Sequence, residues 1–272
     1  MKVMAGDRAD RYVREMMLPS IAKAVGLEEP SLDAIRERLE NPYYCLRAIF
    51  GHYAFARRGK DRFDLADLAM RAIDATFTEE TMEDFLKKPD AVVFWENYKA
   101  ICHKRRRKAM EQLNRGVLQG IAELAQEIYR EDGVGSIAAW VVDAVEEDGR
   151  LEDQFLRMVD VRGVGPKLTS VFLRDMVYLF DLEEQIEPAD LLYVQPIDKW
   201  LRQVGPYVVE ELDGKSADWI LAGKLVKYTR RGEVSGIRFN MGVTYFGMRE
   251  VKDPEKFTAM LANLPEIKRI LG

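Results

Sequence analysis

The amino-acid sequence predicts an all-α protein, because apolar residues recur every three or four positions along most of the chain. This is the spacing of one face of an amphipathic helix. The pattern is clearest at 65–77 and 116–131, and Ser31 precedes a third such stretch as a plausible N-cap. We expect further helices over residues 79–88, 92–113, 136–146, 151–160, 166–179, 197–204 and 254–270.

One stretch interrupts the helical pattern. Residues 222–248 are rich in glycine and aromatic side chains, and predict either a short β-hairpin or a loop that leads into a helix. We find no internal repeat and no low-complexity segment.

Length and composition indicate an ordinary soluble protein. With 272 residues, of which 47 % are hydrophobic, the chain can form one large domain or two small ones. No stretch approaches the roughly 20 uncharged apolar residues that would span a bilayer. The first residues, MKVMAGDRADRY, carry charge where a secretory signal needs an apolar run. We therefore expect a cytoplasmic protein with no membrane association.

The few cysteines and histidines argue against a metal centre. Two of each cannot form a disulfide framework, a four-cysteine zinc site or a four-cysteine iron–sulfur cluster. We expect Cys45 and Cys102 to be buried as small hydrophobic residues, with no metal and no cofactor.

The charge pattern allows a local contact with nucleic acid. A net charge of −5 disfavours a protein that coats nucleic acid nonspecifically, since such binding depends on many phosphate contacts. Basic residues nevertheless cluster at 57–60, 104–108 and 229–231. On charge alone, each cluster is better interpreted as a solvated helix face.

Residues 162–170, RGVGPKLTS, lie between two amphipathic stretches and predict a tight turn between helices. Gly163 and Gly165 can adopt positive φ and allow another backbone to come close, while Val164 can anchor the turn in the core. Pro166 suits the first position of a helix, where a missing N–H costs nothing. The turn thus presents backbone N–H groups at a helix N-terminus, and Gly163, Val164 and Gly165 are candidates for binding a phosphate oxygen.

The stretch VRGVGPKLTSVFL, followed by QPIDKWLRQV, resembles the paired signature of the helix-hairpin-helix base-excision DNA glycosylases. In that superfamily, a lysine in a GVGxK hairpin marks the bifunctional members, which couple base removal to strand cleavage at the abasic (AP) site. Lys167 occupies this position, and Asp198 occupies that of the family's catalytic aspartate. The resemblance implies that both residues lie at the mouth of a DNA-binding cleft between two helical lobes. One lobe would comprise residues 41–180, and the other residues 1–40 and 181–272.

Two upstream stretches extend the resemblance over about residues 41–204. NPYYCLRAIFGHYAFA, at 41–56, is similar to the family's early helix, whose end probes the DNA. HKRRRKAMEQLNRGVLQGIAEL, at 103–124, is similar to the basic helix that precedes the hairpin.

The chain also departs from the common pattern of this superfamily. Lys167 and Asp198 are 31 residues apart, a longer link than in most members and one that resembles the archaeal 8-oxoguanine glycosylase branch. Trp200 replaces the histidine usual two places after the aspartate, and no cluster cysteines follow near the C-terminus. Because of the long link, Asp181 and Asp190 compete with Asp198 for the role of the carboxylate.

The pair Lys167 and Asp198 suits the cleavage of an N-glycosidic bond. Positive charge develops on the sugar as the bond breaks, and a carboxylate beside C1′ stabilises it. A neutral lysine amine can attack C1′ and form a Schiff base, and both desolvation and a helix N-terminus lower a lysine pKa. Taken singly, Lys167 could be a surface lysine and Asp198 a plain helix N-cap. Their order around the hairpin favours the catalytic interpretation.

A damaged base must leave the duplex to reach such a site, so residues that fill the gap or hold the base are expected. Each aromatic candidate is more often a core residue, and Asn240 fits a base-reading amide and a turn residue equally well. The candidates are His52, Tyr53, Phe55, Trp200, Trp219, Phe239, Asn240 and Tyr245.

The sequence therefore predicts a monomeric, nucleoid-associated DNA N-glycosylase with AP lyase activity. The resemblance implies duplex DNA containing a damaged base as the partner, a monovalent cation at the hairpin, and an oxidised purine as the lesion. Two alternatives are a non-enzymatic helix-hairpin-helix DNA-binding protein and a helical scaffold that binds other proteins.

Overall fold

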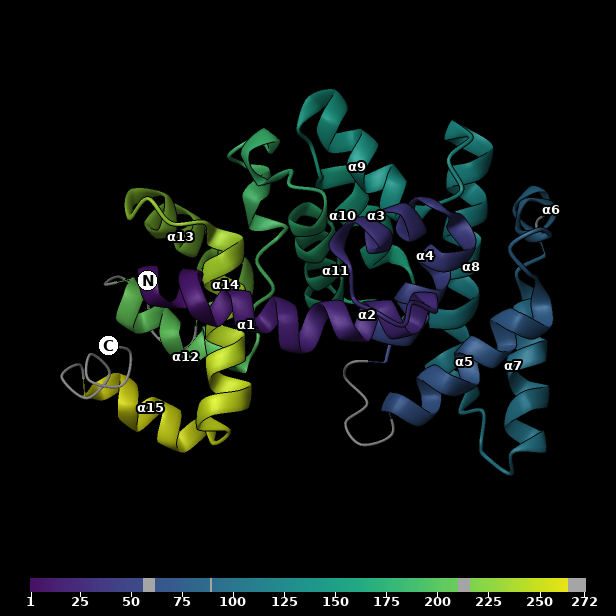
Figure 1. Ribbon diagram of the computed structural model, residues 1–272, viewed down its shortest axis with the longest axis horizontal. Helices are drawn as coiled ribbons and strands as arrows, with labels where there is room; N and C mark the ends of the chain where they lie inside the picture. Colours follow the sequence, from purple (N-terminus) through teal and green to yellow (C-terminus); the bar gives the residue numbers. More distant parts are fainter. Residues whose placement is uncertain (56–61, 89, 210–215, 264–272) are drawn as a thin grey trace. The chain divides into compact units, whose positions relative to one another are not determined.

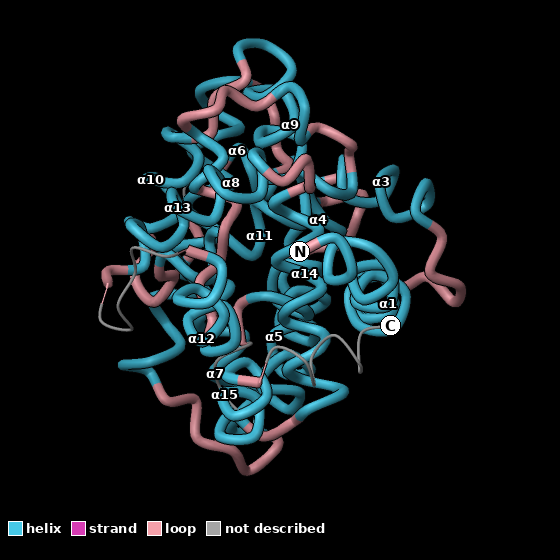
Figure 2. The backbone as a smooth tube through the Cα atoms, turned by 90° about the vertical axis from the view of Figure 1, so that its left-hand side faces the viewer, coloured by secondary structure: helices cyan, strands magenta, loops and turns pink. Residues whose placement is uncertain are grey.

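The computed structural model describes residues 1–55, 62–88, 90–209 and 216–263 (Figure 1). All regular secondary structure in these ranges is helical, and Figure 2 shows only helices and loops there. The predicted all-α fold class is confirmed. Within the same ranges, no helix combines the length and the apolar composition that crossing a membrane requires.

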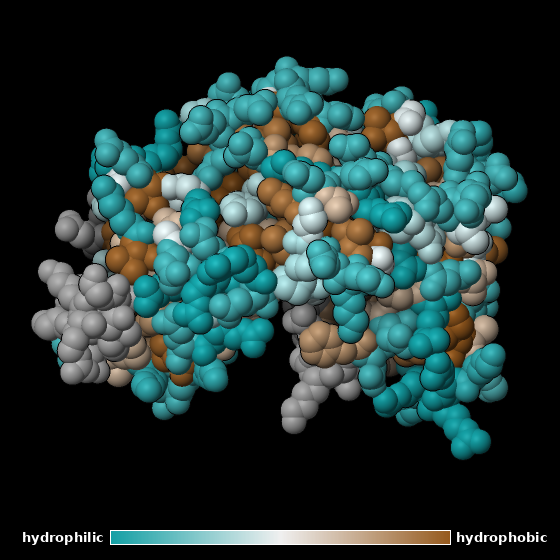
Figure 3. Space-filling model, viewed as in Figure 1, coloured by the Kyte–Doolittle hydropathy of each residue, from teal (hydrophilic) through white to brown (hydrophobic). Residues whose placement is uncertain are grey.

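The face drawn in Figure 3 is mainly hydrophilic, with hydrophobic residues in small separate groups. This distribution is ordinary for a protein surface. Cys45 and Cys102 are both buried, as expected for small hydrophobic residues. In the part of the chain that the structure describes, no cluster of side chains is suited to hold a metal ion.

The chain divides into two compact units. We call residues 18–186 the central unit, and residues 1–17 together with 187–272 the terminal unit. These boundaries differ from the expected ones at 40/41 and 180/181. Residues 18–40 belong to the central unit because helices α2 (Leu18–Val25) and α3 (Leu32–Glu40) pack against α4 (Pro42–Ala48).

The central unit packs around the long helix α8 (Glu111–Asp132). Its predicted apolar stripe, which includes Leu118, Ile121 and Leu124, is buried. The neighbouring helices that contact α8 are α6 (Met82–Lys87), α7 (Val92–Lys104), α9 (Ile137–Asp148) and α10 (Glu152–Asp160). The remaining elements of this unit are η3 (Ile49–Tyr53), α5 (Arg62–Thr76), α11 (Pro166–Leu179) and η5 (Glu183–Gln185).

The expected single helix over 92–113 is wrong. Helix α7 ends at Lys104, and α8 begins only at Glu111. Between them, Arg106 and Met110 have φ values of 54° and 53°, a left-handed conformation that stops a right-handed helix. The basic cluster 104–108 therefore lies at the end of a helix and in a loop, not along the face of a basic helix. The cluster at 57–60 lies outside the described residues.

The terminal unit joins the two ends of the chain. Its N-terminal part contains η1 (Met4–Arg8), α1 (Ala9–Tyr12) and η2 (Val13–Met17). These elements pack on α14 (Gly236–Tyr245), as Figure 1 shows. The other elements are η6 (Asp190–Leu192), α12 (Lys199–Val208), α13 (Asp218–Arg231), η7 (Phe246–Val251) and α15 (Pro254–Ala262).

Of the two alternatives for residues 222–248, the β-hairpin is wrong and the loop that leads into a helix is found. The stretch consists of the greater part of α13, a short loop, α14 and the start of η7. Ser235 caps α14 by accepting a hydrogen bond from the N–H of Arg238. The apolar and aromatic residues that suggested a strand instead lie on the buried faces of α14, and Gly242 allows the N-terminal backbone to approach. The last expected helix ends at Ala262, and residues 264–272 lie outside the description.

Gly242→Ala is expected to destabilise the protein. A Cβ atom at this position would lie 1.8 Å from the backbone carbonyl oxygen of Met4, so α14 and η1 would have to move apart. Overpacking of this kind costs about 1–3 kcal/mol of unfolding free energy. Gly223→Ala is the matched control, because nothing lies within 4 Å of its added Cβ. The control should gain about 0.5–1 kcal/mol in urea denaturation, since alanine favours a helix. Equal stability of the two variants would contradict the tight contact.

Candidate functional site

The turn at 161–165 in the central unit connects α10 to α11, and α11 covers the predicted range 166–179. Gly163 has a φ of 89°, which only glycine adopts readily. Pro166 occupies the first position of α11, and the carbonyl of Gly165 accepts hydrogen bonds from the N–H groups of Leu168 and Thr169. The positive φ of Gly163, the proline position and the helix start are therefore as predicted. The positive φ expected for Gly165 is wrong, because this residue is extended with a φ of −109°.

Two glycines of α8 let the turn approach this helix closely. A Cβ on Gly116 would lie 2.8 Å from the side chain of Arg162, and one on Gly120 would lie 2.8 Å from that of Val161. A Cβ on Gly163 would in turn meet the Val117 side chain at 2.5 Å. The turn therefore packs closely against the first half of α8.

The backbone N–H groups of the turn are not equivalent. Within the described chain, no hydrogen bond occupies the N–H of Gly163 or Gly165. The N–H of Val164 donates to the carbonyl of Val161 at 2.9 Å, and the Val164 side chain is buried. Val164 thus anchors the turn, as the sequence indicated, but its N–H already has an acceptor. The structure leaves Gly163 and Gly165 as the phosphate-binding candidates.

Lys167 is the second residue of α11 and is partly buried. The N-terminus of a helix carries a partial positive charge, which disfavours a second positive charge. The place of Lys167 at the start of α11 is the predicted one, and its catalytic role stays a prediction.

An exposed basic loop leads into the part of α8 on which the turn packs. The residues from 104 to 108 are all exposed. Arg107 forms an ion pair with Asp64 at 2.5 Å, whereas Lys104, Arg105, Arg106 and Lys108 make no ion pair with any described residue. Two residues separate Lys108 from Glu111, the first residue of α8. The central unit thus combines two uncommitted backbone N–H groups with nearby uncompensated positive charge.

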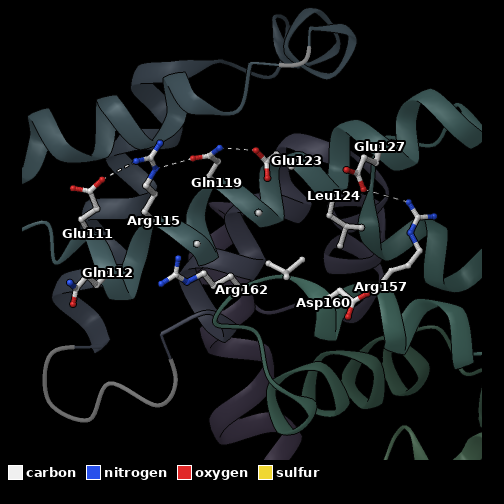
Figure 4. Close-up of a pocket in the computed structure, with 13 residues that line it drawn as sticks. Glu111, Gln112, Arg115, Gln119, Glu123, Leu124, Glu127, Arg157, Asp160 and Arg162 are labelled. Atoms are coloured by element: carbon white, nitrogen blue, oxygen red, sulfur yellow. Dashed lines mark hydrogen bonds and ion pairs between the residues drawn. The ribbon is translucent and has the colours of Figure 1, made fainter.

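A groove with a volume of about 940 Å³ lies between α8 and the end of α10 in the central unit (Figure 4). Along α8, Arg115 bonds to Glu111 and to Gln119, and Gln119 bonds to Glu123. Arg162 lies below this row in the close-up, with Asp160 to its right. Because carboxylates are as prominent as guanidinium groups in this groove, its charge does not favour a polyanion.

In the terminal unit, Asp198 is the N-cap of α12, as predicted. Its Oδ1 accepts hydrogen bonds from the N–H groups of Trp200 and Leu201, at 2.8 and 2.9 Å. Its Oδ2 accepts one from the hydroxyl of Thr244, at 3.2 Å. The carboxylate is partly exposed and is held by groups on α12 and α14.

The two competing aspartates have different surroundings. Asp181 is exposed and has a left-handed φ of 58°, which is typical of a residue that ends a helix. Asp190 is buried in η6. Of the three, Asp198 alone is a helix N-cap with its carboxylate held by backbone N–H groups, which favours it as the candidate.

Most of the aromatic candidates in the terminal unit are core residues. Trp200 packs edge-on against Phe257, and a Cβ on Gly247 would lie 2.2 Å from its ring. Phe239 is buried, and Tyr245 is buried with its hydroxyl donating to Glu15 at 2.7 Å. Trp219 differs, since 71 % of it is exposed. Among these aromatics it is the one available to contact a ligand without rearrangement of the core.

Asn240 is fully buried, so its amide serves the interior of the terminal unit. Its Nδ2 donates to the carbonyl of Pro196 at 3.1 Å and to Oε1 of Gln195 at 3.4 Å. Neither sequence interpretation, a base reader or a turn residue, matches this position in the middle of α14.

In the central unit, Tyr53 and Phe55 are buried, and His52 is mostly so. Their packing places them in the core, the more common environment for such residues. His52 Nδ1 lies 2.6 Å from the hydroxyl of Ser20, and its Nε2 lies 4.0 Å from Oδ2 of Asp175. Burial raises the pKa of the Asp175 carboxyl, and the neighbouring Arg174 opposes this increase.

Arg174 and Asp175 are a buried charged pair that the sequence reasoning missed. Arg174 Nη2 lies 2.7 Å from Asp175 Oδ1, within the apolar stretch FLRDMV of α11. Two charged residues inside an otherwise apolar run are the signal that could have identified them, because charges are rarely buried unless paired.

Comparison with known proteins adds no family assignment, since no family model, no curated protein and no solved structure matches the chain.

Proposed function

We propose that the protein is a base-excision DNA glycosylase with AP lyase activity. The observation that carries this proposal is the turn GVGPK. It offers the free N–H groups of Gly163 and Gly165 for a phosphate, and it places Lys167 at the start of the following helix. The sequence resemblance to the helix-hairpin-helix glycosylases supplies the reaction class. An oxidised purine is the proposed lesion, by analogy with the branch that has a similarly long link.

In the proposed reaction, Lys167 Nζ bonds to C1′ of the damaged nucleotide as the glycosidic bond breaks. The base leaves and takes up a proton. Opening of the sugar ring gives a Schiff base between Lys167 and C1′, and loss of a proton from C2′ then expels the 3′ phosphate. Asp198 stabilises the positive charge that develops on the sugar while the base departs.

Borohydride trapping tests this proposal directly. The full-length protein is incubated with a panel of duplexes that each contain one modified base, including 8-oxoguanine and hypoxanthine, and with a duplex that contains one abasic site. Borohydride reduces a Schiff base to a stable amine, so a covalent protein–DNA adduct is expected with the abasic duplex and with the substrate lesion. No adduct with any duplex would contradict the lyase.

A non-enzymatic DNA-binding protein is the second candidate, and the exposed basic loop favours it. The hairpin N–H groups and the loop at 104–108 could bind the DNA backbone without any chemistry. Salt-dependent binding of an unmodified duplex, together with no adduct and no base release, would support this candidate. A scaffold that binds other proteins would instead show no duplex binding at low salt.

The double variant Arg105→Gln/Lys108→Gln is expected to weaken duplex binding and its salt dependence. Each phosphate contact that is lost lowers the slope of log K against log salt by about 0.9. We therefore expect a slope smaller by roughly 1 to 2 units in fluorescence anisotropy titrations between low and moderate salt.

The matched control is Arg230→Gln/Arg231→Gln. It removes the same charge from the basic cluster at the end of α13, in the terminal unit. If both double variants lower the slope equally, net charge rather than the loop beside the hairpin governs binding.

A further inference from the structure

The segment 194–198, which carries Asp198, is mostly buried and lacks regular secondary structure. Pro196 contributes no N–H, so the segment has few backbone groups with which to fix itself. The N–H of Gln195 donates to the carbonyl of Leu192 at 3.2 Å, and side chains of a neighbouring element hold the segment further. In the terminal unit, α14 provides them from two residues one helical turn apart, Asn240 and Thr244.

Thr244 contacts the carboxylate itself. The two N-cap hydrogen bonds both end on Oδ1 of Asp198, and they leave the orientation of Oδ2 to other groups. The Thr244 hydroxyl donates to Oδ2 at 3.2 Å, and no other described residue donates to this oxygen. Because a carboxylate oxygen accepts up to two hydrogen bonds, Oδ2 keeps capacity for a further partner. Thr244 therefore fixes the plane of the carboxylate without occupying it fully.

Asn240 holds the backbone that precedes Asp198. Its Nδ2 donates to the Pro196 carbonyl at 3.1 Å and to the Gln195 side chain at 3.4 Å. Gln195 in turn lies against Gly236, where a Cβ would approach its Nε2 to 2.9 Å. A larger residue at 236 would thus displace Gln195 and, through it, the Asn240 amide.

Helix α14 is itself anchored within the terminal unit. Gly242 lies against the Met4 backbone, and Arg238 donates to the carbonyl of Ala5 and to Asp10, each at 2.7 Å. Tyr245 donates to Glu15 at 2.7 Å. Because the N-terminal elements hold α14 on the face away from Asp198, α14 can keep the Asp198 carboxylate in one orientation.

From these contacts we infer that α14 is the positioning element for Asp198, with Thr244 setting the orientation of the carboxylate and Asn240 setting the path of the segment before it. This inference rests on the proposed function, since it assigns to Thr244 a role in the base-excision step. Thr244 and Asn240 are positioning residues, because neither is required to touch the DNA.

The test is Thr244→Val, which keeps the shape of the side chain and removes the hydroxyl. The rate constant for base release is measured under single-turnover conditions, with the panel duplex that the wild-type protein cleaves fastest. We expect it to fall about tenfold, the equivalent of one hydrogen bond to a charged group. The dissociation constant for the same duplex should change by less than about twofold, because Thr244 contributes no DNA contact. Thr244→Ser should restore most of the rate, since it restores the hydroxyl.

Thr229→Val is the matched control. Thr229 is also a buried threonine of the terminal unit, but its hydroxyl donates to the carbonyls of Leu225 and Val226 within its own helix. The control should release base at the wild-type rate. If it slows as much as Thr244→Val, or if Thr244→Ser does not restore the rate, the effect is a general loss of stability and the inference is wrong.

A measurement independent of activity separates this inference from the proposed function. The ¹³Cγ resonance of Asp198 should shift in Thr244→Val and stay unchanged in Thr229→Val. A wild-type protein that releases no base and forms no adduct contradicts the proposed function, and the Asp198 resonance then decides alone whether Thr244 orients the carboxylate. An active wild type whose rate and Asp198 resonance are both unaffected by Thr244→Val overturns the inference and leaves the proposed function standing.

Discussion

Lys167→Gln is expected to abolish covalent trapping and strand cleavage at an abasic site. The variant keeps a long polar side chain at the second position of α11 but has no amine to bond to C1′. Loss of a covalent nucleophile should lower the rate of strand cleavage by more than about 10³-fold. The measurement is the yield of borohydride-trapped adduct with the abasic duplex, together with the rate of strand cleavage. Removal of a positive charge from a helix N-terminus should leave the stability of the fold unchanged or slightly higher.

Lys23→Gln provides the matched control for Lys167→Gln. Lys23 is an exposed lysine of α2 in the same unit, so the control makes the same change in charge away from the hairpin. Undiminished trapping by Lys167→Gln would assign the Schiff base to another lysine, and the role of the hairpin would then be limited to binding the DNA backbone.

Asp198→Asn is expected to slow base release by about 10² to 10³-fold, the usual cost of losing one electrostatic stabiliser of a transition state. Asparagine is as good an N-cap as aspartate, and its amide oxygen can still accept from the N–H groups of Trp200 and Leu201. The variant therefore removes the charge while the start of α12 stays intact. Trapping with an abasic duplex should fall less, because the base has already gone and no glycosidic bond has to break.

The chain offers a close control in Asp253→Asn. Asp253 is the N-cap of α15 in the same unit, and its Oδ1 accepts from the N–H groups of Glu255 and Lys256. Asp253→Asn therefore removes the same charge and replaces the same type of N-cap residue, while Asp198 stays unchanged. Wild-type base release by Asp198→Asn, combined with a large loss in Asp190→Asn, would transfer the role of the carboxylate to Asp190.

The turn and the start of α11 followed from the sequence because their causes are local. The glycine at 163 permits a positive φ and the proline at 166 fixes φ at the helix start, and both effects are local. The apolar stripes of α8 and α11 need only their own periodicity to be recognised. The N-cap role of Asp198 is local in the same sense, since its carboxylate bonds to residues two and three positions later.

Other features depend on residues that are distant in sequence. The break between α7 and α8 requires left-handed backbone at Arg106 and Met110, which neither residue type favours by itself. The aromatic stretch at 222–248 became helical because α14 packs on the N-terminal elements, so tertiary packing overrode the strand propensity of its residues. The buried pair Arg174 and Asp175 likewise depends on how α11 is covered.

The sequence by itself determined the all-α fold, the turn at 162–166, and the positions of Lys167 and Asp198 at the starts of two helices. Only the tertiary structure decided that Val164 has a bonded N–H, that Asn240 serves the interior, and that Thr244 holds the Asp198 carboxylate. The physical reason is the separation along the sequence over which each interaction acts. Helical periodicity and capping act over about four residues, whereas the hydrogen bonds from α14 to Pro196 and Asp198 join residues 44 and 46 positions apart, which local patterns do not specify.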